Sequence, residues 1–166
     1  MYIQNVKPGI STTDQRKEGC KKAIDATGGA VTLIGVDYNG DDSSKAAEQT
    51  SAVLAANPDL GGIFGTNLFS ARGAAQAVAN AGLSGVTKIA NFDAPEDSIV
   101  ALRDNIVDIV IAQHPYEIGQ VCVEYAKAAI DGDMSKIQKR FATGYTIITR
   151  DNVDSPEAQQ AIYSSK

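Results

Sequence analysis

Apolar residues along the chain alternate between short continuous runs and longer stretches with helical spacing. The short runs cover residues 2–6, 31–36, 61–66, 88–92, 107–112 and 142–149, and we expect each to be a β-strand. Helical spacing predicts helices over residues 14–26, 41–56, 68–81, 95–103 and 116–131, and residues 156–163 are compatible with a further helix. Strands and helices therefore follow one another in regular order along the chain.

Several residues mark where these helices begin and end. Thr12 or Thr13 is expected to cap the first helix, because a threonine hydroxyl accepts from a free backbone N–H group. Pro95 and Pro115 suit the first turn of a helix, where the missing N–H group is not needed. Gly82 is expected to end the third helix in the left-handed conformation.

This order predicts an α/β fold with a mainly parallel sheet. Strands that alternate with helices of this length form βαβ units, and right-handed crossovers wind them into a doubly wound, three-layer sandwich. The strands are continuously apolar, which is typical of a sheet covered on both faces. With 166 residues, the chain has room for a single domain with a real core.

Charge and composition narrow the classes of partner. The chain is 43% hydrophobic and 21% charged, with a net charge of −5 and no basic stripe, so a nucleic-acid partner is not expected. No apolar run approaches the roughly 20 residues that span a bilayer. Residues 1–9 lack the basic and apolar regions of a signal peptide.

No cofactor or metal is predicted. Cys20 and Cys122 match no metal or redox spacing, and we interpret them as small buried thiols, with a disulfide left open. Asp37, Asp41 and Asp42 lack a ligand spacing and are interpreted as a carboxylate cluster at a helix N-terminus.

Polar side chains follow the predicted strands at the edge where ligands bind in open parallel sheets. Asn67, Asp93 and Gln113 come directly after three apolar strands, and Asp14 lies beyond the first strand. Amides and carboxylates together offer both donors and acceptors, which suits the hydroxyl groups of a sugar or polyol. Phe69 and Phe92 are candidates for an aromatic wall.

Signatures of catalysis are largely absent, and we do not expect an enzyme. The chain has no GxGxxG, Walker or GxSxG motif. His114 is the only histidine and is interpreted as lining a crevice or starting a helix. An enzyme on the same fold stays an alternative, with a catalytic pair drawn from Asp14, Asp93 and His114.

Three motifs and one upstream stretch resemble a known family. Gly65-Thr66-Asn67, Asn91-Phe92-Asp93-Ala94 and the stretch from Ile111 to Gly119 are similar to the C-terminal lobe of periplasmic sugar-binding proteins, as is the stretch from Asp14 to Gly19 upstream. These are the type I, ribose-binding-like solute receptors of ABC transporters, and the similarity covers essentially the whole chain.

The resemblance implies roles for individual residues. In this family the residues that match Asn67, Asp93 and Gln113 hydrogen-bond sugar hydroxyls. An arginine near the start of the first helix commonly contacts the sugar, and the matching position here is Asp14, with Arg16 two residues on. An acidic group at that position would favour a different hydroxyl pattern or an amine-bearing ligand.

The resemblance also implies that residues 1–166 are one lobe of a longer receptor whose N-terminal lobe is missing. The helix within residues 115–132 would pack on that lobe or on a partner protomer, and its apolar stripe includes Ile118, Val121 and Tyr125. We therefore expect a homodimer, which could exchange this segment between protomers.

In the full-length protein the implied partners are a small sugar and the membrane permease of an ABC transporter, in the periplasm or outside the cell at the membrane. The isolated lobe is expected to bind sugar weakly or not at all. The alternative is the effector-binding domain of a lactose-repressor-like transcription regulator, which shares this fold.

Overall fold

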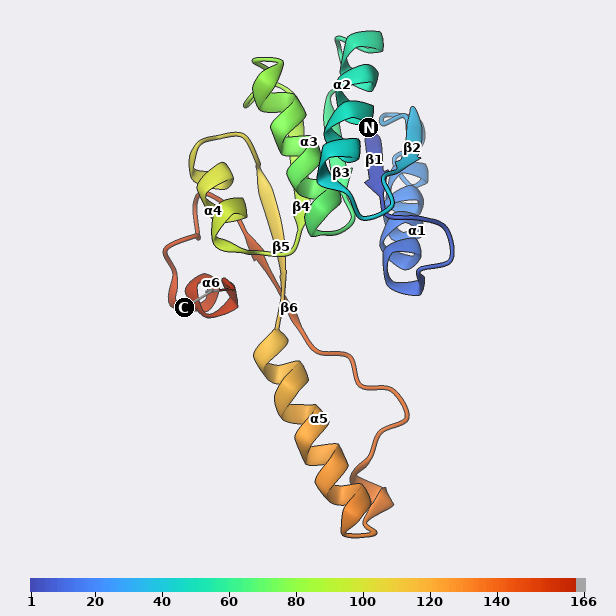
Figure 1. Cartoon of the computed structure of the whole chain (residues 1–166), viewed down its shortest axis with the longest axis vertical. Helices are drawn as coiled ribbons and strands as arrows, with labels where there is room; N and C mark the ends of the chain where they lie inside the picture. The colour runs from blue at the N-terminus through green and yellow to red at the C-terminus, as the bar shows by residue number, and fades with distance from the viewer. Residues whose placement is uncertain (164–166) are drawn as a thin grey trace.

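The computed structural model describes residues 1–163 and contains one six-stranded sheet with helices around it (Figure 1). The strands are β1 (Tyr2–Asn5), β2 (Gly35–Tyr38), β3 (Gly62–Gly65), β4 (Lys88–Phe92), β5 (Ile109–Gln113) and β6 (Tyr145–Ile148). The helices are α1 (Ser11–Asp25), α2 (Ser43–Ala56), α3 (Leu68–Asn80), α4 (Glu96–Arg103), α5 (Pro115–Ile130) and α6 (Pro156–Ala161), with a short 3-10 turn η1 (Met134–Lys136).

The sheet confirms the predicted α/β class. Its strand order is β2-β1-β3-β4-β5-β6, and every neighbouring pair is parallel except β5 and β6, which are antiparallel. The connection from β1 runs to one side and the connections from β3 and β4 run to the other. This reversal between β1 and β3 is the switch point at which ligands bind in doubly wound sheets.

Helices lie on both faces of the sheet but cover them unequally. Side chains of successive strand residues point to opposite faces. Asn91 faces the groove between α3 and α4, whereas Phe92 meets Arg16 of α1 on the other face. Helices α2 and α3 pack closely because Gly73 has no side chain; a Cβ atom there would overlap Ala46 and the backbone of α2.

The face that carries α1 is open at its β5–β6 end. Ile109 and Ile147 are 38% and 40% exposed, and Tyr145 is more exposed still. The expectation of a sheet covered along both faces is therefore correct only for part of it. The physical reason is that α5, which follows β5, leaves the body of the fold and does not return over this face (Figure 1).

Helix α5 extends away from the sheet as an arm (Figure 1). We use "the arm" for residues 115–144, which comprise α5, η1 and the extended segment that returns to β6. Ala128 is the only buried residue of α5, and Tyr125 packs edge-to-face on Phe141 of the returning segment. The arm is thus stabilised mainly by contacts between α5 and the segment that returns to β6.

Two local predictions were wrong. The second strand begins at Gly35, not at residue 31, because it pairs with a β1 of only four residues, Tyr2–Asn5. Helix α1 begins at Ser11 after Ile10, so neither Thr12 nor Thr13 caps it; the Thr13 hydroxyl donates back to the Ile10 carbonyl instead. Asp42 does cap α2, and Gly82 does adopt a positive φ after α3.

The cysteines are less buried than predicted. Cys20 is half-buried, and burial raises the pKa of its thiol. Cys122 is exposed, because it lies on the arm rather than against the sheet. Both are free thiols.

Candidate functional site

The carboxyl ends of β1, β3, β4 and β5 meet at one edge of the sheet, beside the switch point. The first link is between β1 and β3, where the Thr66 hydroxyl donates to Asn5 Oδ1 at 2.7 Å. Thr66 and Asn5 are buried, so this edge has a rigid floor. Side chains from α1, β4 and β5 meet above it.

Asp93 lies at the centre of these side chains. Its Oδ1 atom accepts from Gln113 Nε2 at 2.6 Å, and its Oδ2 atom accepts from the Leu68 N–H group at 3.1 Å. The residue has a φ of 75°, in the left-handed region that aspartate tolerates better than most residues. One carboxylate therefore joins β4, the start of α3 and the end of β5.

Arg16 reaches the same edge from α1. Its guanidinium carbon lies 3.5 Å from the centroid of the Phe92 ring, and its Nη1 atom donates to the Thr66 carbonyl at 3.0 Å. Burial lowers the pKa of Arg16, and the negative charge of Asp93 acts in the opposite direction. Arg16 thus covers one face of Phe92 and lies within the electrostatic range of Asp93.

Asn67 lies next to this group and is held by two bonds. Its Oδ1 atom caps α3 by accepting from the Ser70 N–H group at 3.1 Å, and its Nδ2 atom donates to Asp41 at 2.6 Å. Phe69, the second residue of α3, is half-buried, and its ring centroid lies 5.9 Å from the Arg72 guanidinium carbon. It is therefore paired with Arg72, whereas Phe92 is paired with Arg16.

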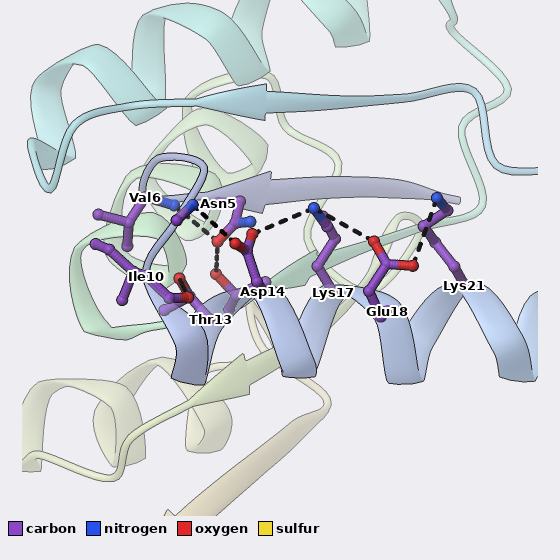
Figure 2. Close-up of polar contacts among 10 residues, drawn as sticks. Asn5, Val6, Ile10, Thr13, Asp14, Lys17, Glu18 and Lys21 are labelled. Atoms are coloured by element: carbon purple, nitrogen blue, oxygen red, sulfur yellow. Dashed lines mark hydrogen bonds and ion pairs between the residues drawn. The ribbon is translucent and has the colours of Figure 1, made fainter.

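Asp14 makes contacts of a different kind (Figure 2). Its carboxylate accepts from the Gly9 N–H group at 2.8 Å and from Lys17 at 3.2 Å, and Glu18 and Lys21 continue the row of charges along α1. The hydrogen bond from Gly9, followed by the one from Lys17, lowers the pKa of Asp14. These contacts fasten the loop before α1, and Arg16 makes the contacts to Phe92 and Thr66.

Sequence reasoning missed Arg16 and Tyr163 as site residues. Arg16 follows the buried Thr13 by three residues and so lies on the same face of α1, but the sequence alone does not show which face of α1 meets the sheet. Tyr163 accepts the Gln113 N–H group on its hydroxyl at 2.9 Å, and its own N–H group donates to Ala94. No pattern near Tyr163 indicates this role.

The assembled group suits a neutral, hydroxylated ligand. It offers a carboxylate, two side-chain amides and a guanidinium beside an aromatic ring, and these groups both donate and accept hydrogen bonds. His114, by contrast, contacts Thr146 at 2.9 Å and Glu117 at 3.3 Å at the start of α5. Among residues 1–163, no three His, Cys, Asp or Glu side chains are grouped to hold a metal ion.

Comparison with known families assigns most of the chain to one family. Residues 1–134 match the model of the periplasmic binding protein domain. The chain belongs to this family.

Individual relatives support the assignment. The chain is 27% identical over 143 residues to the ribose import binding protein of Bacillus subtilis, with 86% of the chain and 45% of the relative covered. A crystal structure of an ABC transporter solute-binding protein from Agrobacterium vitis, bound to α-D-tagatopyranose, is 44% identical with a TM-score of 0.94, and covers 98% of the chain and 54% of that protein.

A second solute-binding protein from Agrobacterium vitis, with bound D-fucose, is 29% identical with a TM-score of 0.91, and covers 98% of the chain and 55% of that protein. The chain thus spans about half the length of these relatives. Nothing in the comparisons supports the alternative of a transcription regulator. Within residues 1–163, no helix combines the length and apolar character required to cross a membrane.

Proposed function

We propose that this chain binds a monosaccharide or polyol as one lobe of an ABC transporter solute-binding protein. The observation that carries this proposal is the group around Asp93, where the carboxylate, Gln113 and Arg16 meet at the carboxyl edge of the sheet. The relatives that share this fold at 44% and 29% identity were crystallised with a tagatose and a fucose.

The sugar would contact Asp93, Gln113 and Asn67, the three residues predicted from the strand ends. Arg16 replaces Asp14 in our proposal, since Arg16 contacts Phe92 beside Asp93 and Asp14 is bonded to Gly9 and Lys17. A neutral sugar then fits better than an amine-bearing ligand. A sugar hydroxyl would take the place of Asp41 as the acceptor from Asn67 Nδ2, since the hydrogen bond between these two residues is solvent-exposed.

We propose the rest of the transport cycle for a longer protein that contains this lobe. A second lobe would close over the sugar, and a membrane permease would receive it, outside the cytoplasmic membrane. One lobe supplies only part of the contacts that enclose a ligand, and small ligands bind tightly when most of their surface is buried. The isolated chain should consequently bind sugar in the millimolar range.

A titration of the isotope-labelled chain tests this function. D-tagatose and D-fucose are added up to about 100 mM while the amide resonances of Asp93, Gln113 and Leu68 are followed by NMR. We expect saturable shifts at these positions and not at exposed α2 residues, and no shifts with glycine betaine, which has no hydroxyl. Sub-micromolar affinity would refute the single-lobe proposal, and unshifted resonances would refute the site.

We further propose that the arm packs on the second lobe in a longer protein, and that the isolated chain uses it to form a homodimer. Tyr116, Val123 and Ile130 lie at intervals of seven residues on one face of α5, and they are 85%, 71% and 85% exposed. This is not the predicted stripe: Val121 and Tyr125 lie on the opposite side of the helix and are half-buried. Such an apolar stripe is typical of a helix that is covered by a partner. In the dimer the arm of each protomer would lie against the other, as in an exchanged segment.

Light scattering on the chain at concentrations of about 10 to 100 µM checks the dimer. We expect a dimeric mass for the wild type and a monomeric mass for Val123→Glu, because a charge in an apolar interface loses its hydration. Val86→Glu is the matched control, since Val86 is equally exposed but lies on the body of the fold. A wild-type monomer throughout this range would refute the dimer.

A further inference from the structure

The turn between β2 and α2 lies next to Asn67 and has an unusual backbone. We use "the β2–α2 turn" for residues 39–42. Gly40 and Asp41 both have a φ of 70°. Glycine adopts this left-handed conformation freely, whereas other residues do so rarely, with aspartate among the more tolerant. The position of Asp41 is therefore imposed by contacts elsewhere in the turn.

The buried side chain of Asn39 supplies these contacts. Asn39 is 1% exposed, and its Oδ1 atom accepts from the Asp41 N–H group at 2.8 Å. Its Nδ2 atom donates to Gln4 Oε1 at 3.0 Å and to Ser70 Oγ at 2.7 Å. The Asn39 N–H group donates to the Asn5 carbonyl of β1. The backbone of the turn is thus fixed to β1 and α3, while the side chain of Asp41 is exposed.

The three acidic residues of this region make different contacts. Asp37 accepts from the Tyr2 hydroxyl at 3.0 Å, and Asp42 caps α2 by accepting from N–H groups of its first turn at 2.7 and 3.0 Å. Asp41 does neither. Its Oδ1 atom accepts from Asn67 Nδ2 at 2.6 Å, across the gap between the β2–α2 turn and the end of β3. Asp41 therefore contacts a residue of the candidate sugar site directly.

The left-handed residues point to the same edge of the sheet. Within residues 1–163, the non-glycine residues with positive φ are Asp41, Asp93 and Asn105. Asn105 follows the end of α4, where this geometry commonly terminates a helix. Asp41 accepts from the Asn67 side chain, and Asp93 accepts from the N–H group of Leu68. Unfavourable backbone conformations gather at ligand sites, and these two aspartates lie on either side of Asn67.

The free hydrogen-bonding capacity of Asn67 lies on its Nδ2 atom. Its Oδ1 atom already caps α3 through Ser70, so Nδ2, bonded to Asp41, is what the half-buried side chain can offer a ligand. One sugar hydroxyl can accept from Nδ2 and donate to the carboxylate with the same oxygen atom. Two such bonds require Nδ2 and the carboxylate oxygen to be about 4.5 Å apart. Rotation of the exposed Asp41 side chain provides this distance while Asn39 holds the backbone.

We propose that Asp41 is a specificity-determining residue of the sugar site proposed above, on which this inference rests. The sugar would insert one hydroxyl between Asn67 and Asp41, accepting from Nδ2 and donating to the carboxylate. An ether oxygen, a carbonyl or a fluorine accepts but cannot donate, so its lone pairs would face the carboxylate without a proton between them. Asp41 thus distinguishes a hydroxyl from every group that only accepts, at one carbon of the ligand.

The test uses the isotope-labelled whole chain with D-tagatose, D-fucose and their monodeoxyfluoro analogues, one for each hydroxyl. Fluorine is close to a hydroxyl in size but donates no hydrogen bond. Amide resonances of Asp93, Gln113 and Leu68 are followed by NMR. We expect one analogue to bind about five- to tenfold more weakly than its parent sugar to the wild type, and at most about twofold more weakly to Asp41→Gly. The ratio of the two affinities cancels any change in overall affinity.

The choice of variants keeps the backbone intact. Glycine adopts a φ of 70° without strain, so Asp41→Gly removes the carboxylate and preserves the turn. Asp41→Asn keeps an acceptor without charge, and we expect its discrimination to be intermediate, about two- to fourfold. Asp59→Asn is the matched control, since it removes the same charge from an exposed aspartate before β3, at the opposite edge of the sheet. Loss of discrimination in this control would contradict the role of Asp41.

A measurement without sugar checks the pair of residues itself. In Asp41→Gly the side-chain amide resonances of Asn67 should move, because they lose their acceptor, while the Ser70 amide stays in place under its cap. Unmoved Asn67 resonances would show that the pair does not form in solution, which contradicts the proposal.

The outcomes separate this inference from the sugar function. Equal discrimination in the wild type and Asp41→Gly overturns the role of Asp41 and leaves sugar binding standing, as does a wild type that accepts every analogue equally. If neither D-tagatose nor D-fucose gives saturable shifts with any of these proteins, the sugar function itself is refuted, and the role of Asp41 with it.

Discussion

Arg16→Ala lowers the free energy of unfolding by about 2–4 kcal/mol and abolishes the sugar-induced shifts. The guanidinium lies 3.5 Å from the Phe92 ring centroid and donates to the Thr66 carbonyl, and both contacts are lost together. A desolvated cation–π contact contributes about 2 kcal/mol, and a hydrogen bond from a charged group contributes about 1.5–3 kcal/mol before relaxation of the site. Urea unfolding followed by circular dichroism measures the change.

Two variants show whether the planar guanidinium is responsible. Arg16→Lys keeps the charge but cannot stack in the same way, so we expect about half of the loss in stability. Lys22→Ala, on the exposed side of the same helix, should change stability by no more than about 0.5 kcal/mol. Equal losses in Arg16→Ala and Lys22→Ala would contradict the role assigned to Arg16.

Asp93→Ala removes detectable sugar binding and destabilises the chain by about 2–3 kcal/mol. Its carboxylate accepts from Gln113 and from the first turn of α3, and both donors lose their partner in the alanine variant. Alanine also tolerates the φ of 75° poorly, at a cost of about 1–2 kcal/mol. The NMR titration with D-tagatose and thermal unfolding of the same samples measure the two effects.

Asp93→Asn separates the charge from the backbone conformation. Asparagine adopts left-handed geometry readily but keeps only one of the two acceptor oxygens, so we expect a loss of about 1–2 kcal/mol, smaller than in the alanine variant. The sugar affinity should nevertheless fall at least tenfold, because an acceptor without charge forms weaker hydrogen bonds to hydroxyls. Wild-type affinity in this variant would mean that the carboxylate is not a sugar ligand.

Part of the site follows from the sequence for a simple geometric reason. Asn67, Asp93 and Gln113 each follow an apolar run, and the carboxyl ends of parallel strands meet at one edge. The structure brings Asp93 and Gln113 into direct contact, and Asn67 precedes the residue whose N–H group Asp93 accepts. Their role as sugar ligands stays a prediction.

The choice between Asp14 and Arg16 could not be made from the sequence. The two residues lie two positions apart on α1, which turns them in different directions. Only the packing of α1 on the sheet shows that Arg16 reaches Phe92, whereas Asp14 turns back to the loop at Gly9. Matching the family arginine to position 14 gives the wrong side of the helix for contact with Phe92.

The sequence by itself determined the fold class, the order of the elements and the edge of the sheet that carries the candidate site, because these depend on local hydrophobic periodicity and on the geometry of parallel strands. Tertiary structure decided what depends on contacts between distant segments. Tyr163 reaches Gln113, and Arg16 covers Phe92. Such contacts join residues that are far apart in the chain, so no local pattern contains them.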